Sequence, residues 1–218
     1  AYISYGDNAY VFFTLEDAVA KANAGETIVL IRDVTAKDIV VIDKAITLDG
    51  NGHKLTSSAG RAINVSGANG VTIKNLTINA SGERAINIIQ NSTNVVIDNV
   101  TATAANYTVN VAASAPGAKV FINNSTLTGL NVVNVAAPSA EVTVTGSTLN
   151  CNDKNASESY AALCLNKDAV GATITATDCE IKVAEGSDSS MAKNGAEDGD
   201  ITINGSKDGD VIEVAYIE

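Results

Sequence analysis

Asparagine residues recur at a nearly constant interval through the middle of this chain. Asn64, Asn87 and Asn110 are 23 residues apart, Asn134 follows after 24, and Cys164 takes the corresponding place after a further 30. An amide donates and accepts hydrogen bonds, but it cannot serve as an acid or a base near neutral pH. The column therefore indicates either amides that bond one another or a stripe that binds a sugar. The amide stack is favoured, because it follows from the repeat itself.

Two arginines accompany the first asparagines. Arg61 and Arg84 each precede the Asn of their unit by three residues, and Glu83 lies beside Arg84. Guanidinium groups on neighbouring units could hold the carboxylates of an acidic sugar. Tyr107 and Asn131 replace them in later units, so any basic patch is two residues wide, and corner residues paired with nearby acids are the simpler explanation. The candidate ligand-binding residues are Arg61, Arg84, Asn64, Asn87, Asn110 and Asn134.

No residue pattern indicates catalysis. Hydrolysis of glycosides needs two carboxylates about 5–9.5 Å apart, whereas the recurring column carries amides, and Asp98 and Asp178 are isolated. His53 is the only histidine and follows a Gly turn. A general base needs a partner within hydrogen-bond reach, and we interpret His53 as a corner residue. We predict no catalytic residue, no metal ligand and no cofactor.

The elements that position these residues repeat along the chain. Ala62–Val65 returns as Ala85–Ile88, and Val71–Ile78 returns as Val95–Ala102. Each unit of about 23 residues contains a strand, a short polar link, a second strand, an Asn or Gly corner and a third strand. Apolar and polar residues alternate at the period of a half-buried strand. The pattern is typical of a solenoid built from short strands.

Stacked units would pair each strand in parallel with its copy, about 4.8 Å away. Apolar residues then form interior ladders. One is predicted to contain Ile63, Ile86, Val109, Val133 and Leu163. Another is predicted to contain Ile73, Ile97, Ile122, Val144, Ile174 and Ile203. With Ile63 and Val65 inward, Ala62 and Asn64 would point outward. We predict an all-β parallel β-helix.

A short helix is predicted before the first strands. Thr14 suits the N-cap position, and Gly25 can stop the helix. Its apolar positions recur on one helical face at Leu15, Ala18, Val19 and Ala22. Such a helix would cover the open end of the coil and its first edge strands. Docking of a partner is the less favoured alternative.

Three stretches at the start of the chain resemble the opening of pectin-lyase-like right-handed β-helix proteins. They are Thr14–Val19, Gly25–Leu30 and Ile46–Gly52, and the resemblance extends through the repeats to about Ile203. It implies a right-handed coil of three parallel sheets. It implies no activity, because this superfamily mixes lyases, glycosidases, adhesins and inert stalks. Gly52-His53-Lys54 departs from the Gly-His-Gly motif of its pectin-degrading glycosidases.

The net charge and the lack of long apolar runs limit the kinds of partner that this chain can bind. The net charge of −11 over 218 residues argues against nucleic acid and anionic membranes, and no apolar run is long enough to insert into a membrane. We predict one domain over residues 1–218, with a cap at 1–25, regular coils at 26–183 and acidic last coils at 184–218. Turn formation explains the acids of that last segment, so calcium is a minor option.

Cysteines and threonines suggest little further chemistry. Three cysteines, Cys151, Cys164 and Cys179, form no disulfide framework. Threonines fall into two columns, and regular flat arrays of threonine can bind ice. The columns are Thr72, Thr143, Thr173 and Thr202, then Thr77, Thr101, Thr126 and Thr148. Val96 and Phe121 interrupt the first column, and β-propensity accounts for most of the array, so ice binding is the least favoured function.

Two classes of function remain. The favoured class is a non-catalytic extracellular module of a bacterial surface or secreted protein, acting as a stalk, an adhesin or a glycan-contacting part. Its expected partners are a polysaccharide or another surface protein, with the chain itself a monomer. The alternative is a small polysaccharide-degrading enzyme of the pectate lyase or glycoside hydrolase type, which only the resemblance supports.

Overall fold

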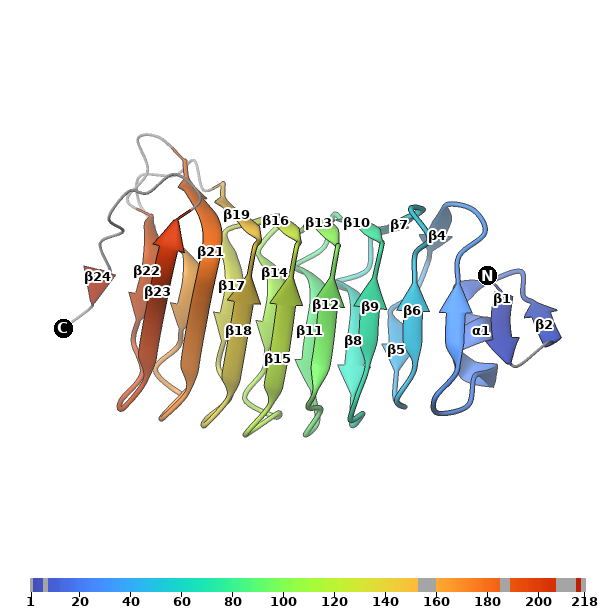
Figure 1. Ribbon diagram of the computed structural model, residues 1–218, viewed down its shortest axis with the longest axis horizontal. Coiled ribbons are helices and arrows are strands. Elements are labelled where there is room, and N and C mark those ends of the chain that lie inside the picture. The colour runs from blue at the N-terminus through green and yellow to red at the C-terminus, as the bar shows by residue number, and fades with distance from the viewer. Residues whose placement is uncertain (1, 6–7, 153–159, 185–188, 207–214, 217–218) are drawn as a thin grey trace.

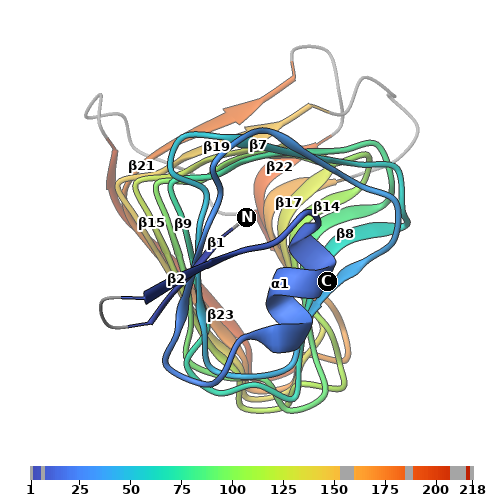
Figure 2. The same cartoon turned by 90° about the vertical axis from the view of Figure 1, so that its right-hand side faces the viewer.

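The chain coils into a parallel β-solenoid of about 7 turns (Figure 1). This computed structural model describes residues 2–5, 8–152, 160–184, 189–206 and 215–216. Seen from the N-terminal end, the chain runs clockwise through three faces as it recedes from the viewer, so the coil is right-handed (Figure 2). The predicted fold class is confirmed.

Each turn contributes one strand to each of three faces, which we name A, B and C. On every face, strands from successive turns pair in parallel. Face A contains β3 (Thr27–Val29), β6 (Thr47–Asp49), β9 (Thr72–Lys74), β12 (Val95–Asp98), β15 (Lys119–Asn123), β18 (Glu141–Thr145) and β23 (Asp200–Ser206). Face B contains β4 (Val34–Ala36), β7 (Lys54–Ser57), β10 (Thr77–Ala80), β13 (Thr101–Thr103), β16 (Thr126–Gly129) and β19 (Thr148–Cys151). Face C contains β5 (Val40–Ile42), β8 (Arg61–Ser66), β11 (Arg84–Ile89), β14 (Tyr107–Val111), β17 (Asn131–Val135), β20 (Ala161–Leu165), β22 (Ser190–Asn194) and β24 (Ala215–Tyr216).

Faces A and B are joined near the C-terminal end by one long strand. β21 (Thr173–Val183) pairs with β18 of face A through its first half and with β19 of face B through its second half. The two faces thus form a single 16-stranded sheet, while face C is a separate 8-stranded sheet. Asp178 lies between the halves with a φ of 52°, and a left-handed residue of this kind bends a strand without ending it.

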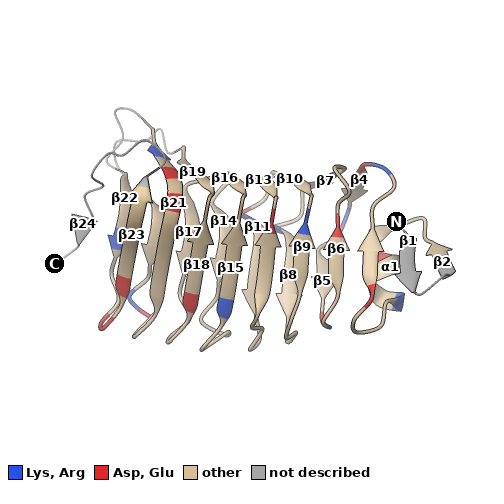
Figure 3. Ribbon diagram, viewed as in Figure 1, with Lys and Arg blue, Asp and Glu red and all other residues tan. Residues whose placement is uncertain are grey.

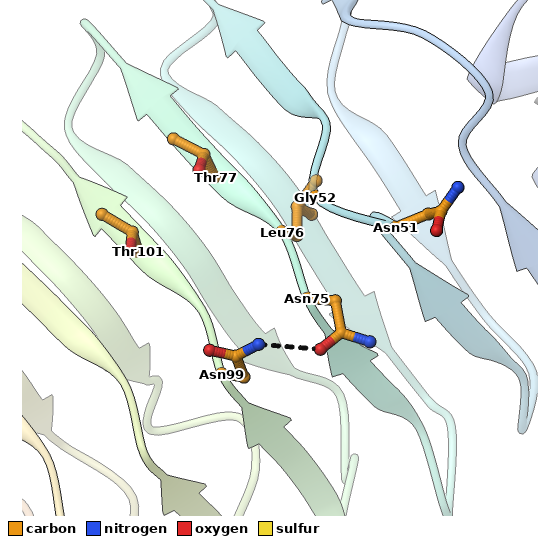
Figure 4. A pocket seen from close by; sticks show the side chains of 7 residues that line it. All are labelled: Asn51, Gly52, Asn75, Leu76, Thr77, Asn99 and Thr101. Atoms are coloured by element: carbon orange, nitrogen blue, oxygen red, sulfur yellow. Dashed lines mark hydrogen bonds between the residues drawn. The ribbon is translucent and has the colours of Figure 1, made fainter.

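In four successive turns, the corner between faces A and B contains a single left-handed residue. Asn75, Asn99 and Asn124 have φ values of 51°, 52° and 49°, and Gly146 follows with 59°. Asn and Gly tolerate this conformation better than other residues, which explains the predicted Asn or Gly corner. The corner amides also bond, since Asn99 Nδ2 donates to Asn75 Oδ1 at 2.9 Å (Figure 4).

Stacked apolar side chains fill the interior. The first predicted ladder, from Ile63 to Leu163, is in register and fully buried. The second is wrong only at Ile174, which pairs with Val142. Ala176 takes its place beside Val144, and Ile203 follows in the same column as predicted. A shift by two residues keeps every side chain on the same face, so alternation alone could not decide this register.

The same shift changes one of the predicted threonine columns. Thr175, and not Thr173, pairs with Thr143, and Thr202 pairs with Thr175. Thr173 pairs with Glu141 instead. Threonine still occupies the column, because the segment carries this residue at both positions.

Ala62 does not point outward as predicted: it is fully buried within the hydrophobic core. Two successive side chains, Ala62 and Ile63, are therefore buried near the start of this face-C strand. Four later residues at this place are buried too: Ala85, Thr108, Val132 and Ala162. Under strict alternation, Arg61 and Asn64 would lie on opposite faces of the strand, because they are three residues apart. The buried pair interrupts the alternation, so both side chains are only partly buried.

The N-terminal cap contains the expected helix, α1 (Leu15–Lys21), which packs against β4 and β5. The hydroxyl of Thr14 accepts a hydrogen bond from the Asp17 backbone N–H at 3.0 Å, as an N-cap does. The helix ends at Lys21 with Ala22 as the C-cap, earlier than Gly25. Lys44 Nζ donates to the carbonyls of Val19, Ala20 and Ala22 at 3.3, 3.4 and 3.1 Å, which satisfies backbone acceptors at the helix C-terminus.

A hairpin that the sequence did not predict extends face A beyond its first parallel strand. β1 (Tyr2–Tyr5) and β2 (Asn8–Val11) pair with each other, and β1 pairs with β3, in both cases antiparallel. The helix was expected to cover all the first edge strands, but β3 is covered by this hairpin. The cap therefore has two parts. The hairpin covers the first strand of face A, and the helix covers the first strands of faces B and C.

Several predictions fall outside the described residues. These are most of the insertion predicted over roughly Asn150–Ser159, of which the structure describes only 150–152, the predicted coil end at Val211–Val214, and the acids Glu185, Asp188, Asp208, Asp210, Glu213 and Glu218. Within the described ranges, no helix has the length and apolar character needed to cross a membrane.

Candidate functional site

One groove on the outer surface of face C collects every residue that the sequence predicted to bind a ligand. Its volume is about 470 Å³, and we call it the face-C groove. The predicted residues that line it are Arg61, Arg84, Asn64, Asn87, Asn110 and Asn134. Tyr107 and Asn166 also line it. The burial of Ala62 and Ile63 explains how an arginine and an asparagine of one strand come to line the same groove.

The asparagines form a hydrogen-bonded ladder. Asn87 Nδ2 donates to Asn64 Oδ1 at 3.0 Å, and Asn110 and Asn134 each donate to the preceding asparagine at 2.7 Å. Every donor thus points toward the N-terminal end of the coil. Asn87, Asn110 and Asn134 are only 2%, 4% and 2% exposed, whereas Asn64 is half-buried. The amides therefore use many of their hydrogen-bond donors and acceptors on one another, as the prediction of an amide stack requires.

Asn166 continues the ladder where Cys164 interrupts it. Asn166 lies just beyond β20, and its Nδ2 donates to Asn134 Oδ1 at 3.1 Å. The Cys164 thiol lies 4.0 Å from Asn166 Oδ1, and burial raises the pKa of this thiol to about 11. Cys164 is therefore a neutral space-filling residue. The sequence signal for Asn166 was present, because residues two apart on a strand share a face.

The two arginines lie on adjacent strands in direct register. The guanidinium carbon of Arg84 is 5.4 Å from the ring centroid of Tyr107, within the range of a cation–π contact. Glu83 is a weak partner, with Oε2 3.9 Å from Arg84 Nη2. The Nε atom of Arg84 is buried and has no hydrogen-bond partner among the described residues. A buried donor without a partner is costly, and a ligand acceptor that reached Nε would remove that cost.

His53 has an acidic neighbour that the sequence analysis missed. Its Nδ1 lies 3.4 Å from Asp33 Oδ1, which also accepts a hydrogen bond from the Lys54 backbone N–H at 3.0 Å. That backbone bond, together with the histidine, holds the pKa of Asp33 below its ordinary value. The coil brings together residues 20 positions apart, which no local pattern reveals. Neither residue lines the face-C groove.

A second hollow of about 340 Å³ lies at the corner between faces A and B (Figure 4). Its lining is made of amides, hydroxyls and one apolar side chain: Asn51, Gly52, Asn75, Leu76, Thr77, Asn99 and Thr101. Nearby, Asp49 accepts hydrogen bonds from the Asn51 backbone N–H at 2.9 Å and from Asn75 Nδ2 at 3.1 Å. We assign the amides of this hollow to the corner ladder, because they bond within the turns, whereas Thr77 and Thr101 belong to the outer surface of face B.

The groups that line the face-C groove suit hydrogen bonding to a ligand. Among the described residues that line it, none is an acid, a histidine or a cysteine. Guanidinium, amide and phenol groups donate and accept hydrogen bonds, but amides and arginines do not exchange protons near neutral pH. No protein-family model, curated protein or solved structure matches this chain.

Proposed function

We propose that this chain is a non-catalytic module of a secreted or cell-surface bacterial protein, and that it contacts a glycan through the face-C groove. One observation carries the proposal: Arg61 and Arg84 lie in register beside a ladder of asparagines in a single groove. Two arginines on neighbouring strands, which are about 4.8 Å apart, match an extended ligand that bears carboxylates.

Electrostatics supports an acidic ligand at this place. The chain has a net charge of −11, so an anion is repelled from most of the surface. The face-C groove is lined by two arginines and by no acid among the described residues. Among the described residues that line the groove, Tyr107 alone is aromatic. Affinity for a sugar ring would therefore be weak, and the charged contacts would dominate.

The alternative is a small polysaccharide-degrading enzyme. The right-handed three-faced coil is in keeping with the pectin-lyase-like resemblance, which motivates this alternative. The groove offers no chemical basis for this enzyme. Hydrolysis needs an acid and a base or nucleophile, and the described residues that line the groove include neither a carboxylate nor a histidine. His53 and Asp33 form a possible acid–base pair, but they lie outside the face-C groove.

Binding and turnover are tested together. The purified chain is incubated with pectate, polygalacturonate, alginate and neutral glycans, with and without calcium, and both retention and products are measured. We expect retention on the acidic glycans and no new reducing ends or unsaturated products. A double variant, R61Q with R84Q, should lose that retention, whereas R32Q, at an exposed position between β3 and β4, should keep it.

Two results would reject the proposal. Products that disappear on substitution of Arg61, Arg84 or His53 would establish the enzyme instead. If no glycan retained the chain, the proposed glycan contact would be rejected. Melting curves of each variant show whether a loss of binding reflects loss of the fold.

A further inference from the structure

The outer surface of face B carries a regular grid of threonine side chains. Its first column is unbroken over four successive strands, at Thr77, Thr101, Thr126 and Thr148. The second column lies two residues further along each strand, at Thr56, Asn79, Thr103, Thr128 and Asn150. Successive strands are about 4.8 Å apart, and the two columns are separated by about 6.6 Å along each strand. The grid is therefore periodic in two directions.

The two sets of threonines in the sequence belong to different faces. The set interrupted by Val96 and Phe121 lies on face A, where the next outward column is charged at Asp49, Lys74 and Asp98. The uninterrupted set lies on face B. β-Propensity explains why threonine suits both surfaces, but it does not explain why the central strands of face B, β10, β13 and β16, carry neither charged nor large apolar side chains on their outer surface.

The central hydroxyls of face B are free. Those of Thr77, Thr101 and Thr126 bond to no other residue in the described part of the chain, and Figure 4 shows Thr77 and Thr101 in the same orientation. Only near one end does the grid bond internally, where Asn150 Nδ2 donates to Thr128 Oγ1 at 3.2 Å. Face C differs, because its asparagines bond one another. Face B thus presents a row of hydroxyls that can each donate and accept.

Charge excludes most ligand classes for this face. β10, β13 and β16 contain no Lys, Arg, Asp or Glu (Figure 3). The first column is bounded by Lys54 at one end and by Glu180 at the other. An ionic ligand finds no partner within these limits. The strands also carry no aromatic residue, so a sugar ring has no platform on which to stack.

We propose that face B binds ice. An ice surface is uncharged, repeats in two dimensions at spacings of the order of the grid, and consists of water molecules that both donate and accept hydrogen bonds. Threonine hydroxyls, and waters held between the columns, join that lattice, while the methyl groups order the water next to them. Each contact is weak, but the contacts act together because the coil holds them at fixed spacing.

The test uses the full chain and measures thermal hysteresis, the shape of single ice crystals and uptake into growing polycrystalline ice. We expect the wild type to shape crystals and to enter the ice. T101Y and T126Y, which place bulk in the middle of the grid, should abolish all three effects. T143Y on the outer surface of face A is the matched control and should retain them. Circular dichroism and melting curves verify the fold of each variant.

A double variant, T101V with T126V, isolates the hydroxyls, because it keeps the shape and the β-branching. It should weaken uptake into ice, and it decides the matter if the tyrosine variants fail to fold. Exclusion of the wild-type chain from ice would overturn the proposal. Equal loss in T143Y would overturn it as well. Exclusion from ice together with adsorption to a crystalline neutral polysaccharide would assign face B to glycan contact instead.

Discussion

Asn166 Nδ2 donates to Asn134 Oδ1 at 3.1 Å although Cys164, two residues earlier, occupies the place that asparagine holds in the preceding turns. The amide ladder thus passes an interruption in the repeat without losing a member. Every bond in it has the same direction, from a later turn to an earlier one. A substitution of Asn by Asp keeps the shape of the side chain but removes its donor. Its effect on stability should therefore depend on whether the replaced asparagine donates to an earlier turn or only accepts.

Asn110→Asp should destabilise the coil, while Asn64→Asp should not. Asn110 donates to Asn87 and is 4% exposed, so the aspartate would set two acceptors against each other, at a cost of about 2 kcal/mol. Asn64 accepts from Asn87, and an aspartate there still accepts. Chemical denaturation at neutral pH measures both. Equal losses of stability would show that the assigned donor direction is wrong.

Ile97→Asp should unfold the coil or cost about 4 kcal/mol or more, because an unpaired carboxylate would replace a fully buried ladder residue. Thr72 lies on the neighbouring strand of face A and is only partly buried. Thr72→Asp should change the free energy of unfolding by about 0.5 kcal/mol or less. Thermal melting of the pair tests which side chains face the interior, and equal shifts would refute the register.

Lys44→Met should loosen the helical part of the cap. The ammonium group donates to three backbone carbonyls at the end of α1, and its loss should cost about 1 kcal/mol. Lys37→Met is the control, because Lys37 is exposed. Hydrogen exchange should accelerate for the α1 amides in the Lys44 variant and not in the control. Unchanged protection would mean that packing alone holds the helix.

Acidification should weaken the segment after the helix through Glu26. Hydrogen bonds from the backbone and side-chain amides of Asn23, at 2.7 and 3.1 Å, hold the pKa of Glu26 below its ordinary value of 4.5. A lowered pKa in the folded state stabilises the fold above the ordinary value, and this contribution is lost as the pH falls through the folded-state pKa. Glu26→Gln should melt earlier at neutral pH and respond less to acid. An unchanged pH profile would contradict this role.

The Cys164 thiol should resist alkylation in the native chain at mildly alkaline pH. Burial leaves it 4% exposed and raises its pKa to about 11, and the thiolate is the reactive form. Peptide mapping after iodoacetamide treatment should find Cys164 unlabelled in native buffer and labelled in denaturant. Rapid native labelling would show that the end of the ladder opens.

The repeat made most of the fold predictable. An interval of 23 or 24 residues between identical short stretches defines turns, and alternation within them defines the interior, so the parallel coil and its first ladder followed directly. The same repeat placed the asparagine column and both arginines. Their convergence in one groove needed the structure, because it depends on the paired burial of Ala62 and Ile63, and strict alternation does not predict such a pair.

The other differences arise where the repeat carries no information. After the longer 30-residue step, Ile174 and Ala176 were equally compatible with alternation. The contact of Asp33 with His53 joins unlike residues in successive turns, so no recurring pattern could indicate it. The hairpin of β1 and β2 precedes the repeat altogether and runs antiparallel to it.

The amide ladder also gives the face-C groove a polarity. Each peptide-like amide carries a dipole of about 3.5 D, and the five amides of Asn64, Asn87, Asn110, Asn134 and Asn166 are joined head to tail. Their positive ends point toward Asn64, which lies on the same strand as Arg61, in the half of the groove whose strands carry both arginines. The fields of the ladder and of the arginines therefore add at that end and oppose each other nowhere along the groove. A chain of repeating sugars with distinct ends would meet a gradient here, and would lie in one direction in preference to the other.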